Sequence, residues 1–68
     1  MPNESEAYRT LITVPASDGN FIWALQKYAT RDDLLKAQYY FEDNPSGNKT
    51  RLHAVKSEIR KRQKEGRF

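Results

Sequence analysis

The chain has 68 residues and a net charge of +3, with no cysteine and a single histidine, His53. A chain of this length forms one domain at most, and its stability is marginal because it buries only about 60% of the surface that the unfolded chain exposes. The composition excludes disulfides, thiolate metal sites and metal sites built from several histidines of one chain. The longest apolar run, Phe21 to Leu25, is far shorter than the roughly 20 residues of a membrane span.

The charge is concentrated at the C-terminal end of the chain. Residues 1–48 hold four basic and seven acidic residues, whereas residues 49–68 hold eight basic and two acidic residues. Asymmetry of this kind points to a nucleic acid or another acidic partner. We therefore expect the functional surface to lie in the last part of the chain.

The first elements are predicted to be a disordered tail and a strand. Residues 1–7 are polar and acidic, so we expect them to form a disordered N-terminal tail. They do not resemble a signal peptide, and we expect a cytoplasmic protein with no membrane partner. Residues 8–14 are rich in β-branched and aromatic side chains and are followed by Pro15, a pattern that predicts a strand.

Residues 21–28 are compatible with a strand or a helix. The Asp18–Gly19 pair before them is typical of a hairpin turn between two apolar runs. A strand would pack Trp23 in the core, whereas a helix would leave it on the polar side. Ala29 passes directly into a helix cap at Thr30 without a left-handed stop residue, which also favours the strand.

Two helices are predicted in the second half. Thr30 is a good N-cap whose hydroxyl can pair with Asp33 in a capping box, and the helix runs over residues 31–42. Pro45 disfavours its continuation. A second helix follows over residues 49–64, with Gly66 as its stop.

These elements predict an α+β fold in a single domain over residues 8–65. Its order is ββαα, a β-hairpin of residues 8–14 and 21–28 followed by a helical hairpin, with residues 66–68 as a short tail. The alternative is a three-helix bundle in which residues 18–28 are helical. A two-stranded hairpin has exposed edges, so a homodimer that covers one edge is a further alternative.

The predicted helix 49–64 separates apolar from basic residues. With an advance of about 100° per residue, Leu52, Val55 and Ile59 share a stripe that would pack on the core. Beside it runs a row of residues that we name the basic ridge: Lys49, His53, Lys56, Arg60, Lys64 and Arg67. Like charges at this spacing repel one another, so a polyanion partner would explain the row. A solvated face that complements the helix dipole is the alternative.

The candidate binding residues follow from this helix and from two tyrosines. The residues predicted to bind nucleic acid or an acidic partner are Lys49, Arg51, His53, Lys56, Arg60, Lys61 and Lys64. Phe21, Trp23 and Phe41 are expected in the core, because a small domain needs large side chains to bury enough area. Tyr39 and Tyr40 are adjacent and cannot both point inward, so they are candidates for contact with a partner protein.

No catalytic, cofactor or metal site is predicted. Asp32 and Asp33 suit the first turn of a helix, where the dipole favours acidic residues. The Asn44–Thr50 segment superficially resembles a phosphate loop but lacks the required glycine spacing and the preceding strand. The same segment is compatible with a helix-turn-helix, in which the start of the second helix would contact bases.

Two functions fit these features. The first is a small non-enzymatic, nucleic-acid-binding or regulatory protein that uses the basic ridge. The second is an inhibitor or adaptor that docks on a host protein or on a nucleoprotein complex, such as an anti-defence protein. In length, lack of cysteine and uneven charge, the chain resembles accessory proteins of phages and plasmids as a type.

Overall fold

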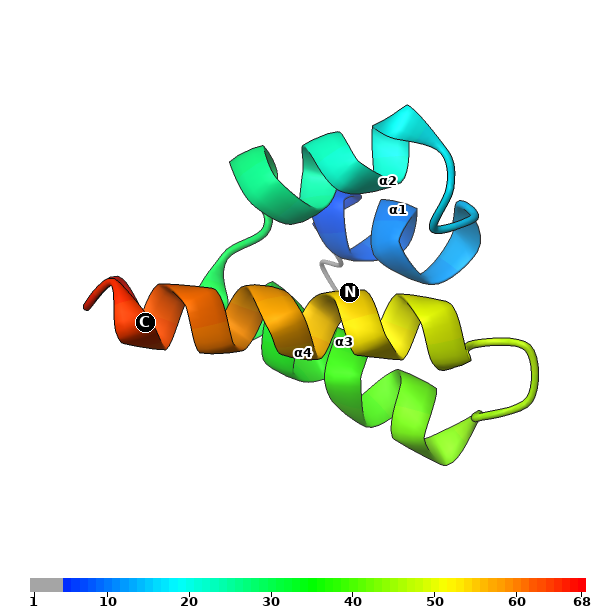
Figure 1. The fold of residues 1–68 in the computed structure, drawn as a ribbon. Coiled ribbons are helices and arrows are strands. Elements are labelled where there is room, and N and C mark those ends of the chain that lie inside the picture. Colours follow the sequence, from blue (N-terminus) through cyan, green and yellow to red (C-terminus); the bar gives the residue numbers. More distant parts are fainter. Residues whose placement is uncertain (1–4) are drawn as a thin grey trace.

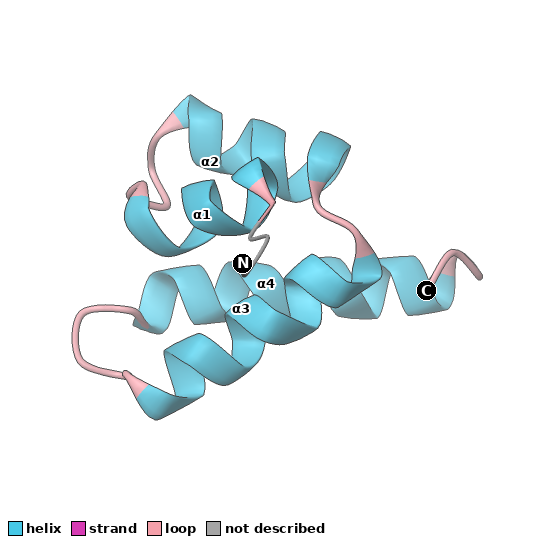
Figure 2. Ribbon diagram, turned by 180° about the vertical axis from the view of Figure 1, so that it is seen from behind, coloured by secondary structure: helices cyan, strands magenta, loops and turns pink. Residues whose placement is uncertain are grey.

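The computed structural model describes residues 5–68, and every regular element in this range is a helix. The elements are α1 (Glu6–Thr13), α2 (Gly19–Trp23), the π-helical turn η1 (Ala24–Tyr28), α3 (Arg31–Asp43) and α4 (Lys49–Lys64). The views from the front and from behind show a hairpin of α1 and α2–η1 stacked on a hairpin of α3 and α4 (Figures 1 and 2).

The predicted α+β fold is therefore wrong. No β-hairpin is present in residues 5–68, and the segments predicted as strands, 8–14 and 21–28, are helical. The helical alternative, with residues 18–28 in a helix, fits the structure, although α1 adds a helix that the three-helix bundle did not include.

Helix α1 forms because its apolar residues follow a helical spacing. Ser5 is the N-cap, and its hydroxyl accepts a hydrogen bond from the backbone N–H of Tyr8 at 3.0 Å. Ala7 and Leu11, four residues apart, are buried. Residues 1–4 of the predicted tail lie outside the described residues, whereas residues 5–7 form the cap and first turn of α1.

Helix α2 begins at an Asp18 cap, whose carboxylate accepts from the backbone N–H of Asn20 at 2.8 Å. It buries Phe21 and continues directly into η1, in which the N–H of Ala29 donates to the carbonyl of Ala24, five residues back. The prediction that Trp23 lies in the core is wrong, since 54% of this residue is exposed. Phe21 occupies the core instead.

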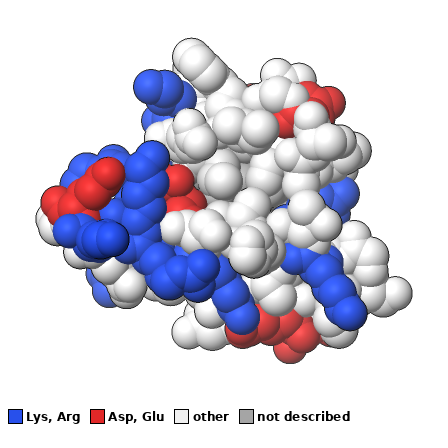
Figure 3. Space-filling view, in the orientation of Figure 1, with Lys and Arg blue, Asp and Glu red and all other residues white. Residues whose placement is uncertain are grey.

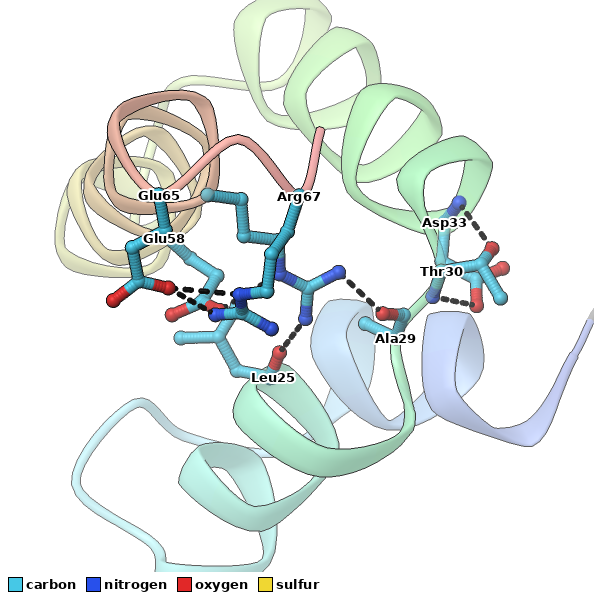
Figure 4. Close-up of polar contacts among 8 residues, drawn as sticks. Leu25, Ala29, Thr30, Asp33, Glu58, Glu65 and Arg67 are labelled. Carbon is cyan, nitrogen blue, oxygen red and sulfur yellow. Dashed lines mark hydrogen bonds and ion pairs between the residues drawn. The ribbon is translucent and has the colours of Figure 1, made fainter.

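The second hairpin lies close to its predicted boundaries. Thr30 and Asp33 form the expected capping box, with hydrogen bonds of 3.2 and 2.9 Å (Figure 4). Gly47, in the connection to α4, has a φ of 77°, which L-residues rarely adopt. Gly66, with a φ of 76°, ends α4 in a Schellman motif in which the N–H of Arg67 donates to the carbonyl of Arg62 at 2.8 Å.

The core lies between the two hairpins. Helix α1 packs on α3, and η1 lies against α1 and α4. The largest of its fully buried side chains come from all four α-helices: Leu11, Phe21, Leu34, Phe41 and Val55. A polar contact also joins the hairpins, since the Ser5 hydroxyl donates to the buried Asp33 carboxylate at 2.8 Å. Among the described residues, no helix is long and apolar enough to cross a bilayer.

Candidate functional site

Helix α4 has an inner face and an outer face. On the inner face, Val55 and Ile59 are buried and Leu52 packs against the core. The basic ridge runs along the outer face, where Lys49, His53 and others are exposed. Figure 3 shows Lys and Arg atoms in a band that follows α4, with uncharged surface above it over α2. The packing of the apolar stripe on the core therefore fixes which side of α4 faces solvent.

Four of the predicted binding residues carry charges without an acidic partner. No carboxylate lies within ion-pair distance of Lys49, Arg60, Lys61 or Lys64 in residues 5–68. Arg60 makes one hydrogen bond, at 3.4 Å, to the Ser57 hydroxyl of its own helix. These cations are solvated and available to an anion.

Two members of the basic ridge are paired with carboxylates. Lys56 lies 3.7 Å from the Glu42 carboxylate of α3, and both side chains are more than two-fifths exposed. The guanidinium of Arg67 lies 2.7 Å from the carboxylate of Glu65, beyond the end of the helix. Exposed pairs of this kind contribute about 0–1 kcal/mol, so Lys56 can exchange Glu42 for an external anion at little cost.

Arg51 is directed into the protein rather than outward. Its Nε donates to the carbonyl of Val14 at 2.9 Å, and its Nη1 donates to the side-chain oxygen of Asn48 at 2.6 Å. This arginine ties the start of α4 to the end of α1. The structure therefore does not place Arg51 with the exposed cations of the outer face. Arg51 is also not free to contact bases, as a helix-turn-helix would require.

Arg62 is the most deeply buried of the basic residues on α4, and the sequence did not single it out. It lies on the inner face with 9% of its surface exposed. Its Nε donates to the Glu58 carboxylate at 2.8 Å. Its Nη1 and Nη2 donate to the carbonyls of Ala29 and Leu25, at 2.8 and 3.0 Å (Figure 4).

The π-helical turn explains why the carbonyl of Leu25 is available. In an α-helix the N–H of Ala29 would bond the carbonyl of Leu25, but here it bonds Ala24. Leu25 therefore needs another donor, and a buried carbonyl without one would be costly. Arg62 supplies it, with Glu58 holding the guanidinium in place. Two of the eight cations at the C-terminal end, Arg51 and Arg62, are thus structural.

The two tyrosines lie apart from the basic ridge. Tyr39 is 66% exposed and Tyr40 38% exposed, and the Tyr40 ring packs edge-on against Phe41. Among the described residues no hydrogen bond, ion pair or ring contact joins either tyrosine to the ridge. They are accessible to a partner, but they do not form one site with the cations.

The exposed apolar residues that the sequence did not identify lie on α2–η1. Ile22 is 46% exposed, and Trp23 and Tyr28 form an exposed edge-to-face pair with ring centroids 6.0 Å apart. The Lys27 ammonium lies 6.0 Å from the centroid of the Trp23 ring. The helical arrangement of residues 21–28 already implied an outward Trp23, so the signal was present in the alternative interpretation.

The described residues contain no group of three or more metal-ligating side chains. Comparison of the chain with protein-family models, with curated proteins and with solved structures found no match.

Proposed function

We propose that this chain is a small, non-enzymatic cytoplasmic protein that binds the phosphate backbone of a nucleic acid along the outer face of α4. The contacting residues are Lys49, His53, Arg60 and Lys64, with Lys61 beside them and Lys56 recruited from its ion pair with Glu42. The observation that carries the proposal is the row of exposed cations without carboxylate partners on a helix fixed by its inner face.

Geometry and charge support this proposal. From Lys49 to Lys64 the helix rises about 22 Å. Duplex DNA carries one negative charge for about every 1.7 Å of its axis, so a row of this length faces many phosphates. The row contains no acidic side chain on the exposed line of the helix, because Glu58 is buried and Glu65 pairs with Arg67. We expect backbone contact rather than base readout, since Arg51 is engaged by Val14.

A second candidate function is a phage- or plasmid-type inhibitor or adaptor that docks on a host protein or nucleoprotein complex. It is supported by the exposed apolar residues of α2–η1, Ile22, Trp23 and Tyr28. Aromatic anchors of this kind are enriched in protein–protein interfaces. A basic row next to an apolar surface also suits an RNA- or DNA-bound complex.

Fluorescence anisotropy with labelled duplex DNA, single-stranded DNA and RNA over a range of salt concentrations tests the primary proposal. We expect binding at low salt, with log K falling against log salt at a slope of roughly −4 for duplex DNA. The double variant Arg60→Gln/Lys64→Gln should weaken binding about 10- to 100-fold at low salt and reduce the slope by about two.

The matched control is Arg9→Gln/Lys36→Gln, which removes the same charge from exposed positions on α1 and α3. It should bind nearly as well as the wild type. If both double variants weaken binding equally, net charge rather than the outer face of α4 is responsible, and the proposal fails. It also fails if none of the three nucleic acids binds at low salt.

A further inference from the structure

A groove of about 420 Å³ lies between α2–η1 and α4, beside the basic ridge. Its first wall includes Ile22, Leu25 and Gln26, and its second wall includes His53, Ala54 and Lys61. The uncharged surface over α2 in Figure 3 borders the band of Lys and Arg atoms along α4. The groove thus joins an apolar surface to a cationic one.

The apolar part of the groove is accessible. Ile22 is 46% exposed, although it belongs to a small domain with few large apolar residues to spare for its surface. Below it, Phe21 and Leu25 are buried and form a fixed floor. An apolar side chain that enters here would contact Ile22 and Ala54 without any rearrangement of the core.

The charged part of the groove is positive. Lys61 lines it without an acidic partner, and His53 lies on the same wall. The acidic residue in the lining, Glu58, is buried, and Arg62 holds its carboxylate at 2.8 Å. An occupant with carboxylates therefore meets the Lys61 ammonium and no free negative charge in this lining.

We propose that this groove binds an acidic amphipathic helix of a partner protein. Such a helix presents apolar residues at i, i+3 or i+4, and i+7 to an apolar groove, which here is lined by Ile22 and Ala54. Its flanking carboxylates pair with the Lys61 ammonium and can accept a hydrogen bond from His53, and the charge complementarity at Lys61 sets its orientation. The groove shares His53 and Lys61 with the phosphate-binding row, whereas Ile22 and Ala54 lie outside that row. The proposal therefore goes beyond the nucleic-acid function.

Two other occupants fit less well. Single-stranded bases stack on exposed aromatic rings, but the aromatic residue in this lining, Phe21, is 1% exposed. A second copy of the chain would have to offer its acidic helix α3. The apolar stripe of that helix, Leu34, Ala37 and Phe41, is completely buried in its own core.

Selection of a yeast-displayed library of random 16-residue peptides against the immobilised full chain tests the proposal. We expect the enriched peptides to combine Asp or Glu with Leu, Ile or Phe at helical spacing. Ile22→Asp should weaken their binding at least tenfold. Trp23→Ser, which changes an exposed apolar residue that lines a different groove, should leave it unchanged.

A charge exchange provides the second variant. Lys61→Glu should also weaken the enriched peptides, and replacement of their Glu by Lys should restore binding to this variant. Ile22 and Lys61 are exposed, so both variants should unfold in urea close to the wild type. Absence of enriched peptides, enriched peptides without acidic residues, or equal binding to wild type and Ile22→Asp would overturn the proposal.

The remaining outcomes separate this proposal from the nucleic-acid function. Arg60→Gln/Lys64→Gln should lose nucleic acid and keep the peptides, whereas Ile22→Asp should do the reverse. If Ile22→Asp instead abolishes nucleic-acid binding, the groove is part of the nucleic-acid-binding surface. If the wild type self-associates in sedimentation equilibrium and Ile22→Asp is monomeric, the occupant is a second copy. Either result contradicts a partner helix.

Discussion

The two faces of α4 use the same residue type for opposite purposes. Arg60, on the outer face, is exposed and has no carboxylate partner within the described residues. Arg62, on the inner face, is buried and bonds Glu58 and the carbonyls of Leu25 and Ala29. The difference shows that a cluster of basic residues in a sequence can contain both a binding surface and an internal support, and that burial decides which residue is which.

The largest effect on stability is expected when the buried arginine, Arg62, is removed. Arg62→Ala leaves the Glu58 carboxylate and two carbonyls without their donor, and we expect a loss of about 3–5 kcal/mol in the free energy of unfolding. A domain of this size has only roughly 3–10 kcal/mol in total, so the variant should be partly or wholly unfolded. Urea denaturation followed by far-UV circular dichroism measures the loss.

Arg60→Ala is the control for this experiment. Because Arg60 is exposed, the substitution should change the free energy of unfolding by less than about 0.5 kcal/mol. A destabilisation as large as that of Arg62→Ala would show that the two faces of α4 do not differ in the way described. Arg62→Lys keeps the charge but not the planar set of donors. The free energy of unfolding of this variant should lie between those of Arg62→Ala and Arg60→Ala.

A smaller effect is expected from the carboxylate that orients Arg62. Glu58→Gln keeps the shape of the side chain but removes its charge, and we expect a loss of about 1–3 kcal/mol in the free energy of unfolding. Glu65→Gln, at the exposed pair with Arg67, should cost less than about 0.5 kcal/mol. Equal costs for the two substitutions would contradict a supporting role for Glu58.

The smallest effect on stability is expected at the outer face of α4, where Glu42 pairs with Lys56. Glu42→Gln releases Lys56 from an exposed ion pair and should change the free energy of unfolding by less than about 0.5 kcal/mol. The same substitution removes a negative charge beside the ridge. In the salt titration, duplex DNA should bind more tightly at low salt, since Lys56 no longer has to leave Glu42 to contact a phosphate. Unchanged or weaker binding would place the nucleic acid elsewhere.

The second hairpin was predictable because its determinants are local. The Thr30–Asp33 capping box, Pro45 and Gly66 lie within a few residues of the helix ends that they define. The positions of Val55 and Ile59 on one face also follow from helical spacing alone. The exposed cations Lys49, Lys61 and Lys64 were predicted for the same reason.

The first hairpin was not predictable by the same reasoning. In residues 8–14 the β-branched side chains suggested a strand, but the spacing of Ala7, Leu11 and Val14 is that of a helix packed on one side. In residues 21–28 the absence of a left-handed stop argued against a helix. In the structure the carbonyls at the end of η1 are satisfied by Arg62 instead of by a left-handed residue. Arg62 lies 33 and 37 residues beyond its two acceptors, and no local pattern reveals such a contact.

The bonds from Arg62 to Leu25 and Ala29 also bear on when the protein folds. During synthesis the last residue of the first hairpin's carbonyl pair, Ala29, is added 33 residues before its donor Arg62. Until then η1 has two carbonyls without their protein partner and can interconvert with other local structures. We therefore expect the domain to complete its folding only after α4 has been synthesised, in one cooperative step that involves both hairpins.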